Sequence, residues 1–209
     1  MNKIQKNLLF LCIGIVTGFA ISKLPLYQTT QETPTDSAST QSQTKIIKHI
    51  QTSVPEKSAN GNCWTMSIAT PSNDKAWRCS EGNFIYDPCF DVGNNKVVCT
   101  PDPEDEASGI TLKLTENLPS DNERPAQKET HAWLYQLPNN IKCYALTGTA
   151  DSIGEDLYYY SCDNGALMRG DIENAIQKDG PVWTTTIVYR DNNFKITKKE
   201  MLDILNVWY

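Results

Sequence analysis

Short runs of aromatic and β-branched residues alternate with polar turn residues along most of the chain. Runs of this kind, separated by Pro, Asn, Asp and Gly, are typical of strands in all-β domains. The runs that we expect to form strands are Trp64–Ala69, Phe84–Tyr86, Lys96–Cys99, Ile110–Leu114, Ala132–Leu137, Ile141–Thr147, Leu157–Ser161 and Val182–Tyr189. The pattern predicts a mainly β, antiparallel sandwich or barrel-like domain with little helix.

Two segments fit a helix as well as another structure. In residues 198–209, Glu200 completes a helix-capping box with Thr197, and four apolar residues share one helical face. The last six residues fit a terminal strand equally well. Asp171–Lys178 is long enough for two helical turns before the Gly-Pro pair that follows it. The residues alone leave both choices open.

The first 27 residues are typical of an export segment, because Lys3 and Lys6 precede an apolar run, Leu8–Ile21. This segment is either an uncleaved signal anchor or a cleaved signal peptide. Its Cys12 follows a leucine rather than a small residue, which argues against lipid attachment. We expect a single-pass membrane protein with an extracytoplasmic C-terminal domain, or a secreted protein if the signal is cleaved.

Residues 28–45 are rich in Ser, Thr, Gln and Pro and carry too little apolar surface to fold, which predicts a disordered linker. The remaining residues, 46–209, suit one extracytoplasmic β-rich domain. The whole chain has a formal charge of −6, and residues 1–45 contain four lysines and two acidic residues, so the domain carries −8. An acidic domain repels phosphate backbones, so nucleic acid is not an expected partner.

Six of the seven cysteines follow the export segment, and four of them lie in two similar passages. Each passage has a cysteine followed by an aromatic residue, then a second cysteine, then a glycine three residues later. Exported cysteines usually pair, and two passages that fold alike would form two disulfide-tied hairpins in two pseudo-repeated halves. The expected disulfides are Cys63 with Cys79, Cys143 with Cys162, and Cys89 with Cys99.

Zinc binding and thiol catalysis are less consistent with these cysteines. Structural zinc sites use closely spaced ligand pairs, whereas the nearest cysteines here are ten residues apart and only His49 and His131 could assist them. A catalytic thiolate has to be unpaired and activated by a neighbouring base. We therefore expect structural cysteines and assign no metal or cofactor.

Several segments resemble a small exported domain found in otherwise uncharacterised bacterial proteins. They are residues 62–69, 76–79, 82–90, 180–184 and 207–209, which read NCWTMSIA, AWRC, GNFIYDPCF, GPVWT and VWY. The resemblance covers the chain from Gly61 to Tyr209. It implies a bacterial, extracytoplasmic domain, favours a strand at the C-terminus, and supplies no catalytic residues.

The acidic residues Asp102, Glu104, Asp105 and Glu106 form a loop that is either simply solvated or a calcium site, although it lacks the spacing of an EF-hand. His131 is a candidate general base beside Trp133, but the sequence names no partner for it, and a surface or strand-edge position is the simpler interpretation. His49 leaves the linker and is a weaker candidate.

Three consecutive tyrosines, Tyr158, Tyr159 and Tyr160, are the possible ligand-facing residues. In a strand, alternate side chains point to opposite faces, so at least one ring should face outward while its neighbours pack. Core packing is the expected role of the tryptophans. These are Trp64, Trp77, Trp133, Trp183 and Trp208.

The sequence shows a rigid scaffold without a coherent catalytic set. We therefore expect a non-enzymatic binding or interaction module of the bacterial cell envelope, with an unknown envelope ligand or protein as its partner. One alternative is a hydrolase of envelope polysaccharide or peptidoglycan that uses paired carboxylates. Another is a purely structural envelope domain.

Overall fold

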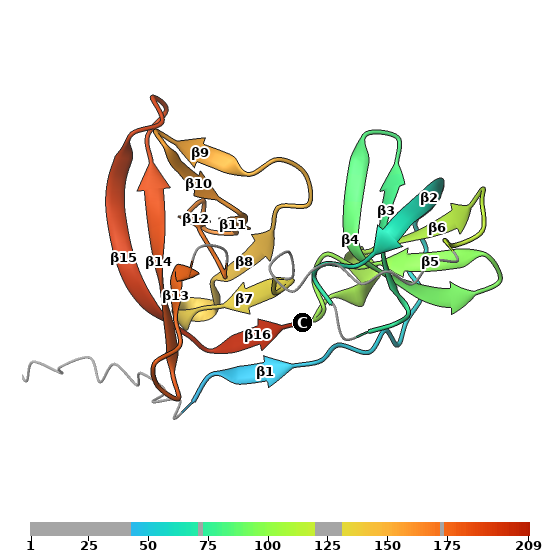
Figure 1. Ribbon diagram of the computed structural model, residues 1–209, viewed down its shortest axis with the longest axis horizontal. Coiled ribbons are helices and arrows are strands. Elements are labelled where there is room, and N and C mark those ends of the chain that lie inside the picture. Colours follow the sequence, from blue (N-terminus) through green and yellow to red (C-terminus); the bar gives the residue numbers. More distant parts are fainter. Residues whose placement is uncertain (1–42, 71–72, 120–130, 172–173) are drawn as a thin grey trace, which may run out of the picture. The chain divides into compact units, whose positions relative to one another are not determined.

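The chain folds mainly into strands, which confirms the predicted fold class (Figure 1). The structure is a computed structural model that describes residues 43–70, 73–119, 131–171 and 174–209. The strands are β1 (Lys45–Ile47), β2 (Ser58–Met66), β3 (Ala76–Glu81), β4 (Phe84–Gly93), β5 (Lys96–Cys99), β6 (Ile110–Leu114), β7 (Leu134–Gln136), β8 (Lys142–Ala145), β9 (Asp151–Ile153), β10 (Asp156–Tyr158), β11 (Tyr160–Cys162), β12 (Leu167–Met168), β13 (Ile176–Gln177), β14 (Trp183–Arg190), β15 (Ile196–Ile204) and β16 (Asn206–Trp208). The described residues also include the 3₁₀ helices η1 (Glu106–Ser108) and η3 (Pro138–Asn140).

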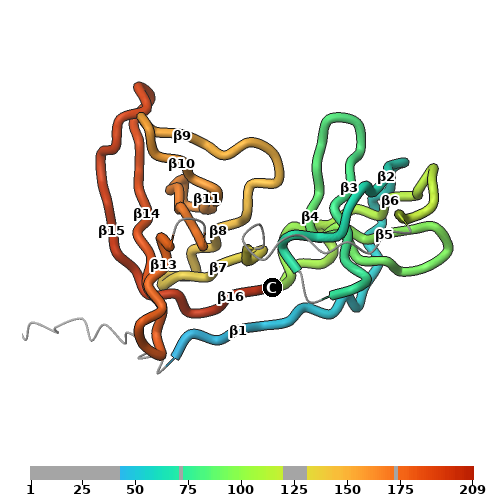
Figure 2. Tube along the Cα trace, viewed as in Figure 1, coloured from blue at the N-terminus to red at the C-terminus, as the bar shows by residue number. Residues whose placement is uncertain are grey.

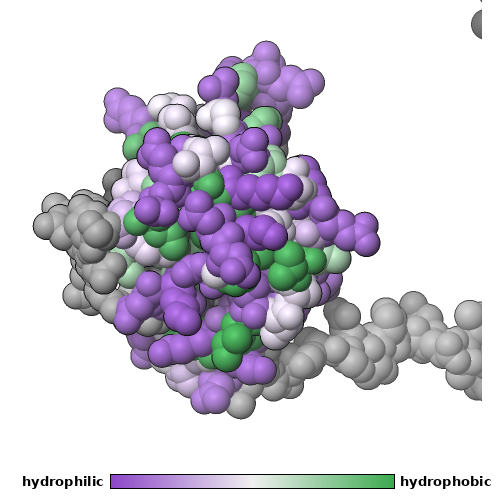
Figure 3. Space-filling view, turned by 90° about the vertical axis from the view of Figure 1, so that its right-hand side faces the viewer, coloured by the Kyte–Doolittle hydropathy of each residue, from purple (hydrophilic) through white to green (hydrophobic). Residues whose placement is uncertain are grey.

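Strands β2 to β6 close into a barrel. Consecutive strands pair antiparallel, so the first and the fifth run in the same direction, and the barrel closes through a parallel pairing of β2 with β6. The barrel interior is filled by a cluster of buried apolar side chains and cystines. Its largest members include Trp77, Val97, Ile110 and Leu112. Figure 3 views the molecule from the right of Figure 1; most of this surface is hydrophilic, with separate hydrophobic areas.

The other strands form a nine-stranded sheet in the order β1-β16-β7-β8-β11-β12-β14-β13, with β15 on β14, and the hairpin β9–β10 is separate. A second core packs against this sheet around Tyr135, Tyr160, Met168 and Ile187. Strand β1 lies parallel to β16, so the first described strand and the last pair side by side (Figure 2). Because β1 begins at Lys45, the folded part starts one residue before the predicted boundary.

All three predicted disulfides are present. Each joins residues that lie directly opposite one another on neighbouring antiparallel strands, with Cα atoms 3.9 to 4.0 Å apart. The two similar passages occupy corresponding places, because one bridge ties β2 to β3 and another ties β8 to β11. Gly82 and Gly165 of the repeated pattern both have positive φ, at 56° and 81°, in the turns that follow. The repeat in the sequence therefore marks two antiparallel strand pairs that are tied by a disulfide in the same way.

Both helical alternatives are wrong for the residues that the structure describes. Residues 196–204 and 206–208 are strands, because β15 pairs with β14 over eight registered positions and β16 pairs with β7. Within Asp171–Lys178, Ile176 and Gln177 pair with β14, while residues 172–173 lie outside the described ranges. Long-range pairing has overridden the local helical pattern in both places.

The export segment, residues 1–27, and residues 28–42 of the linker lie outside the described ranges. Among residues 43–70, 73–119, 131–171 and 174–209, no helix is long and apolar enough to span a membrane.

Three of the five tryptophans are buried: Trp77, Trp133 and Trp208. Trp183 is partly buried against the sheet core. Trp64 is 48% exposed, so the prediction of a core role is wrong for this residue. It lies at an irregularity in the pairing of β2 with β3, where Cys63 and Thr65 are in register with Cys79 and Arg78.

Gly170 packs closely against the ring of Tyr160 in the sheet core. Its φ is +74°, and a Cβ placed on it would lie 2.0 Å from the Tyr160 ring. The Tyr160 hydroxyl donates to the Ala132 carbonyl at 2.6 Å, so the ring is held and cannot move aside easily. The ring of Tyr160 therefore requires glycine at position 170.

We predict that Gly170→Ala lowers the free energy of unfolding by about 1–2 kcal/mol for the left-handed backbone and by a further ~1–3 kcal/mol for the forced contact with Tyr160. Gly165→Ala is the matched control, because φ is +81° there but no atom lies within 4 Å of the added Cβ. Urea unfolding of both variants measures the difference. Equal losses would show that the ring contact is unimportant.

We also predict that reduction abolishes cooperative unfolding. Three bridges at about 2–4 kcal/mol each amount to much of the roughly 5–15 kcal/mol that stabilises a typical domain. The measurement is a thermal melt of reduced and alkylated protein beside the oxidised form. A melting temperature that falls by only a few degrees would contradict this role for the disulfides.

Candidate functional site

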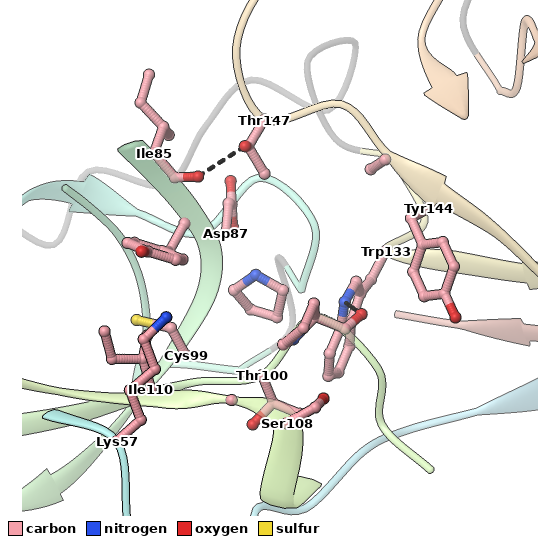
Figure 4. A pocket seen from close by; sticks show the side chains of 15 residues that line it. Lys57, Ile85, Asp87, Cys99, Thr100, Ser108, Ile110, Trp133, Tyr144 and Thr147 are labelled. Atoms are coloured by element: carbon pink, nitrogen blue, oxygen red, sulfur yellow. Dashed lines mark hydrogen bonds between the residues drawn. The ribbon is translucent and has the colours of Figure 1, made fainter. Parts of the chain in front are cut away.

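A cavity of about 330 Å³ lies where barrel residues meet Trp133, β8 and the loop after β8 (Figure 4). Most of its lining is apolar or contributed by backbone. The lining residues are Lys57, Ile85, Tyr86, Asp87, Pro88, Cys99, Thr100, Pro101, Ser108, Gly109, Ile110, Trp133, Tyr144, Ala145 and Thr147. A concave, largely apolar pocket with a few polar groups is the usual form of a small-molecule site.

Asp87 is the carboxylic acid of this lining, and it is only 8% exposed. It belongs to β4, whose neighbouring residues are apolar. One carboxylate oxygen accepts from the Ser67 hydroxyl at 2.5 Å; the other accepts from the Ile68 amide at 3.3 Å and lies 3.4 Å from Nη1 of Arg78. The carboxylate is thus held by donors on one side while its residue lines the cavity on the other.

Burial raises the pKa of the Asp87 carboxyl to about 6, although the Ser67 hydrogen bond and the charge of Arg78 act in the opposite direction. At neutral pH most molecules therefore carry a buried negative charge at the cavity, and below about pH 6 most carry a neutral acid. A buried, perturbed carboxyl in a pocket is a common mark of a functional site.

The loop after β8 closes one rim of the cavity through Thr147. The Thr147 hydroxyl donates to the Ile85 carbonyl at 2.7 Å (Figure 4). Nη2 of Arg78 donates to the Thr147 carbonyl at 2.5 Å. Arg78 therefore connects the loop to Asp87. Its guanidinium also lies 5.9 Å from the centre of the exposed Trp64 ring.

The opposite wall is held by Trp133, which directly precedes β7, and by residues of β8. The indole N–H of Trp133 donates to the Pro101 carbonyl at 3.0 Å. Asp102 accepts from Lys142 at 2.7 Å and from the Tyr144 hydroxyl at 3.1 Å, and Lys142 also pairs with Glu104. These contacts fix the loop that carries Thr100 and Pro101 against the sheet.

Contacts within this wall shift the pKa values of Asp102 and Tyr144. Partial burial acts to raise the pKa of Asp102, but hydrogen bonds from Lys142 and from the Glu104 amide outweigh it and hold the pKa below its ordinary value. Burial and the negative charge of Asp102 raise the pKa of Tyr144 to about 12. Tyr144 therefore stays a hydrogen-bond donor at all ordinary pH values.

The acidic loop is used within the protein. Asp102 and Glu104 pair with Lys142, and Glu106 accepts hydrogen bonds from the amides of Thr52 and Ser53. Asp102 and Glu104 converge on the Lys142 ammonium group, while Glu106 faces other donors, and among the described residues no three acidic, histidine or cysteine side chains form a group that could hold a metal ion. The contacts favour a structural role over the calcium site considered from the sequence.

The two histidines lie in other surroundings than the sequence predicted. His49 belongs to the folded domain: its side chain is only 8% exposed, and its ring lies 5.3 Å from Phe90 and 5.2 Å from Trp133 between centroids. His131 precedes β7 and is not in a strand; its ring meets the Tyr160 ring edge to face at 6.1 Å. Neither histidine lines the cavity.

The three consecutive tyrosines do not form a ligand surface. Tyr158 and Tyr160 are buried, at 2% and 0% exposure, so the prediction that they face a ligand is wrong. Tyr159 is partly exposed and packs against the sheet core. Tyr158 and Tyr160 belong to two different buried clusters, and Tyr159 lies between β10 and β11, so the three rings do not follow the alternation of a single strand.

Sequence reasoning missed Asp87, Arg78 and Thr147. A usable signal was present for Asp87, because an acid within the otherwise apolar stretch of residues 85–90 has to be buried with partners or excluded from the strand. Arg78 and Thr147 gave no such signal, since they are 69 residues apart and meet only in the folded chain.

The chain was compared with protein-family models, with curated proteins and with solved structures, and none of them matches. The resemblance to an exported bacterial domain therefore stays a prediction. The cavity and its residues are the basis for the function proposed below.

We predict that Asp87→Asn stabilises the protein more at pH 7 than at pH 4. The raised pKa means that the folded state holds the Asp87 proton more tightly than the unfolded state does, so stability is greatest below about pH 4 and falls as the pH rises to about 6. The variant should remove this fall, which amounts to about 3 kcal/mol.

Urea unfolding between pH 4 and pH 8 measures this effect. Glu155→Gln is the matched control, because Glu155 is exposed in the turn between β9 and β10. Parallel pH profiles of the wild type and Asp87→Asn would contradict the raised pKa.

Proposed function

We propose that this chain is a non-enzymatic ligand-binding module of the bacterial cell envelope, and that the cavity beside Asp87 is its binding site. The supporting observation is the combination of a largely apolar cavity of about 330 Å³ with a buried carboxyl in its lining. Burying a carboxyl lowers stability unless its interactions compensate, and such groups are often retained for function.

The cavity favours a ligand group about the size of one side chain. Its volume lies near the lower end of the roughly 300–1,000 Å³ of small-molecule sites. Trp133, Ile110 and Pro88 offer apolar contact, and Asp87 offers a hydrogen-bond acceptor that is negatively charged at neutral pH. We infer a ligand with an apolar body and one donor group, preferably an amine.

Binding is better supported than hydrolysis. Cleavage of a glycosidic bond ordinarily uses two carboxyl groups that flank the bond. The described lining of the cavity contributes Asp87 alone, and the nearby Asp102 is engaged by Lys142 and Tyr144. A purely structural domain could hold the Ser67 turn with a neutral side chain, at a lower desolvation cost than that of the buried Asp87 carboxyl.

An extracytoplasmic location is part of the proposal. Three disulfides favour an oxidising compartment, and the basic and apolar order of residues 1–27 is typical of an export segment. We propose a single-pass protein whose C-terminal domain lies outside the cytoplasmic membrane, or a secreted form if the signal is cleaved.

We predict that benzylamine and benzyl alcohol bind the full-length protein and that benzoate does not. The charge of Asp87 should favour the protonated amine and repel the carboxylate. Asp87→Asn should weaken benzylamine at least about tenfold, as expected for loss of a charge-assisted hydrogen bond, and leave benzyl alcohol within about twofold. Titration calorimetry at pH 7.5 measures all three probes.

Glu155→Gln serves again as the control that should change nothing. Equal affinity of the amine for wild type and Asp87→Asn would exclude Asp87 as the recognition group. Absence of binding by all three probes would favour the purely structural alternative.

A further inference from the structure

Strand β15 is a long edge of the main sheet (Figure 1). It spans nine residues and pairs with β14 on one side. Along its other side, no strand of the described ranges pairs with it. Such an edge presents a row of backbone donors and acceptors that can pair with another strand.

The outer face of β15 carries the exposed side chains of Lys199, Met201 and Asp203. Met201 is 64% exposed, an unusual position for a large apolar side chain. Within the described part of the chain, neither Lys199 nor Asp203 makes an ion pair or a side-chain hydrogen bond. Both charges are therefore open to a partner on the free edge.

A second copy of the same strand could pair with this edge only in a few registers. In an antiparallel pair of identical strands related by a twofold axis, side chains opposite one another point to the same face. One residue must then lie on the axis, and residues at equal distances before and after it face each other. Each choice of axial residue fixes every cross-strand pair.

Charge selects one of these registers. With Lys198, Lys199, Glu200 or Asp203 on the axis, that charged residue would face its own copy, and like charges directly opposite one another are destabilising. With Met201 on the axis, Lys199 faces Asp203 of the second copy, and the twofold creates this pair twice. With Leu202 on the axis, no opposite charges face each other.

We propose that a second copy of this chain pairs antiparallel with the free edge of β15, with Met201 on the twofold axis and two symmetric Lys199–Asp203 ion pairs. The pairing joins the two sheets and covers the exposed Met201 side chain with its own copy. The adjacent lysines, which protect an edge from general aggregation, disfavour the competing registers.

Charge exchange tests the register. Lys199→Asp should place two acids opposite each other and Asp203→Lys two lysines, so each variant alone should be monomeric. An equimolar mixture of the two should form a heterodimer, because both cross-strand pairs are then complementary. The double variant Lys199→Asp/Asp203→Lys should dimerise like the wild type. Analytical ultracentrifugation of the full-length chain in a mild detergent measures all four cases.

Crosslinking tests the axial residue independently. In a Cys12→Ser background, Met201→Cys should form a disulfide dimer under mild oxidation, because cross-strand positions on the axis bring two Cβ atoms within about 4.5–5.5 Å. Thr197→Cys is the matched control on the same strand; it lies four residues from the axis and should not crosslink.

Two results would overturn this register. One is that Lys199→Asp or Asp203→Lys alone still dimerises. The other is that Thr197→Cys crosslinks as readily as Met201→Cys. A wild type that stays monomeric at high concentration would overturn the pairing itself. Circular dichroism of each variant checks that the fold is retained, and the exposed positions of the changed residues make this the expected result.

Discussion

Trp133 joins the barrel to the sheet, and the candidate site depends on this joint. Its buried ring lies beside His49 and Phe90, and its indole N–H reaches the Pro101 carbonyl. One side chain thus supplies a large apolar contact and a satisfied donor in a single place. Because the ring is held by residues from three parts of the chain, the walls of the cavity keep a fixed spacing.

Asp87 links the stability of the barrel to the chemistry of the cavity. Its carboxylate orients Ser67, whose oxygen in turn accepts from the amides of Ala69 and Thr70. A neutral side chain could hold the same turn at a lower desolvation cost. The raised pKa shows that the surrounding donors do not fully compensate the buried charge. This imbalance, together with the place of Asp87 in the cavity lining, supports the proposal that a ligand pairs with the carboxyl.

The strand-rich fold class and the disulfide pairing were predictable from the sequence, and the candidate site was not. The internal repeat led to the correct disulfides because each bridge joins directly paired antiparallel strands, with cysteines only 10 to 19 residues apart in the chain. The helical pattern of residues 198–209 was misleading, since the eight pairs between β14 and β15 outweigh it. The cavity depends on contacts such as Arg78 with Thr147, whose separation of 69 residues leaves no trace in a local pattern. His49 likewise became a core residue through distant rings.

The two proposed surfaces are compatible in one molecule. In the sheet order, β15 is four strands away from β8, which carries part of the cavity wall. Four strand spacings amount to about 19 Å, so pairing at the β15 edge leaves the cavity open. A twofold dimer would then present two equivalent cavities, and two linked sites bind a repetitive ligand more tightly than either site alone. If the proposed envelope ligand is a repetitive polymer, a weak, side-chain-sized site gains most from being displayed in pairs.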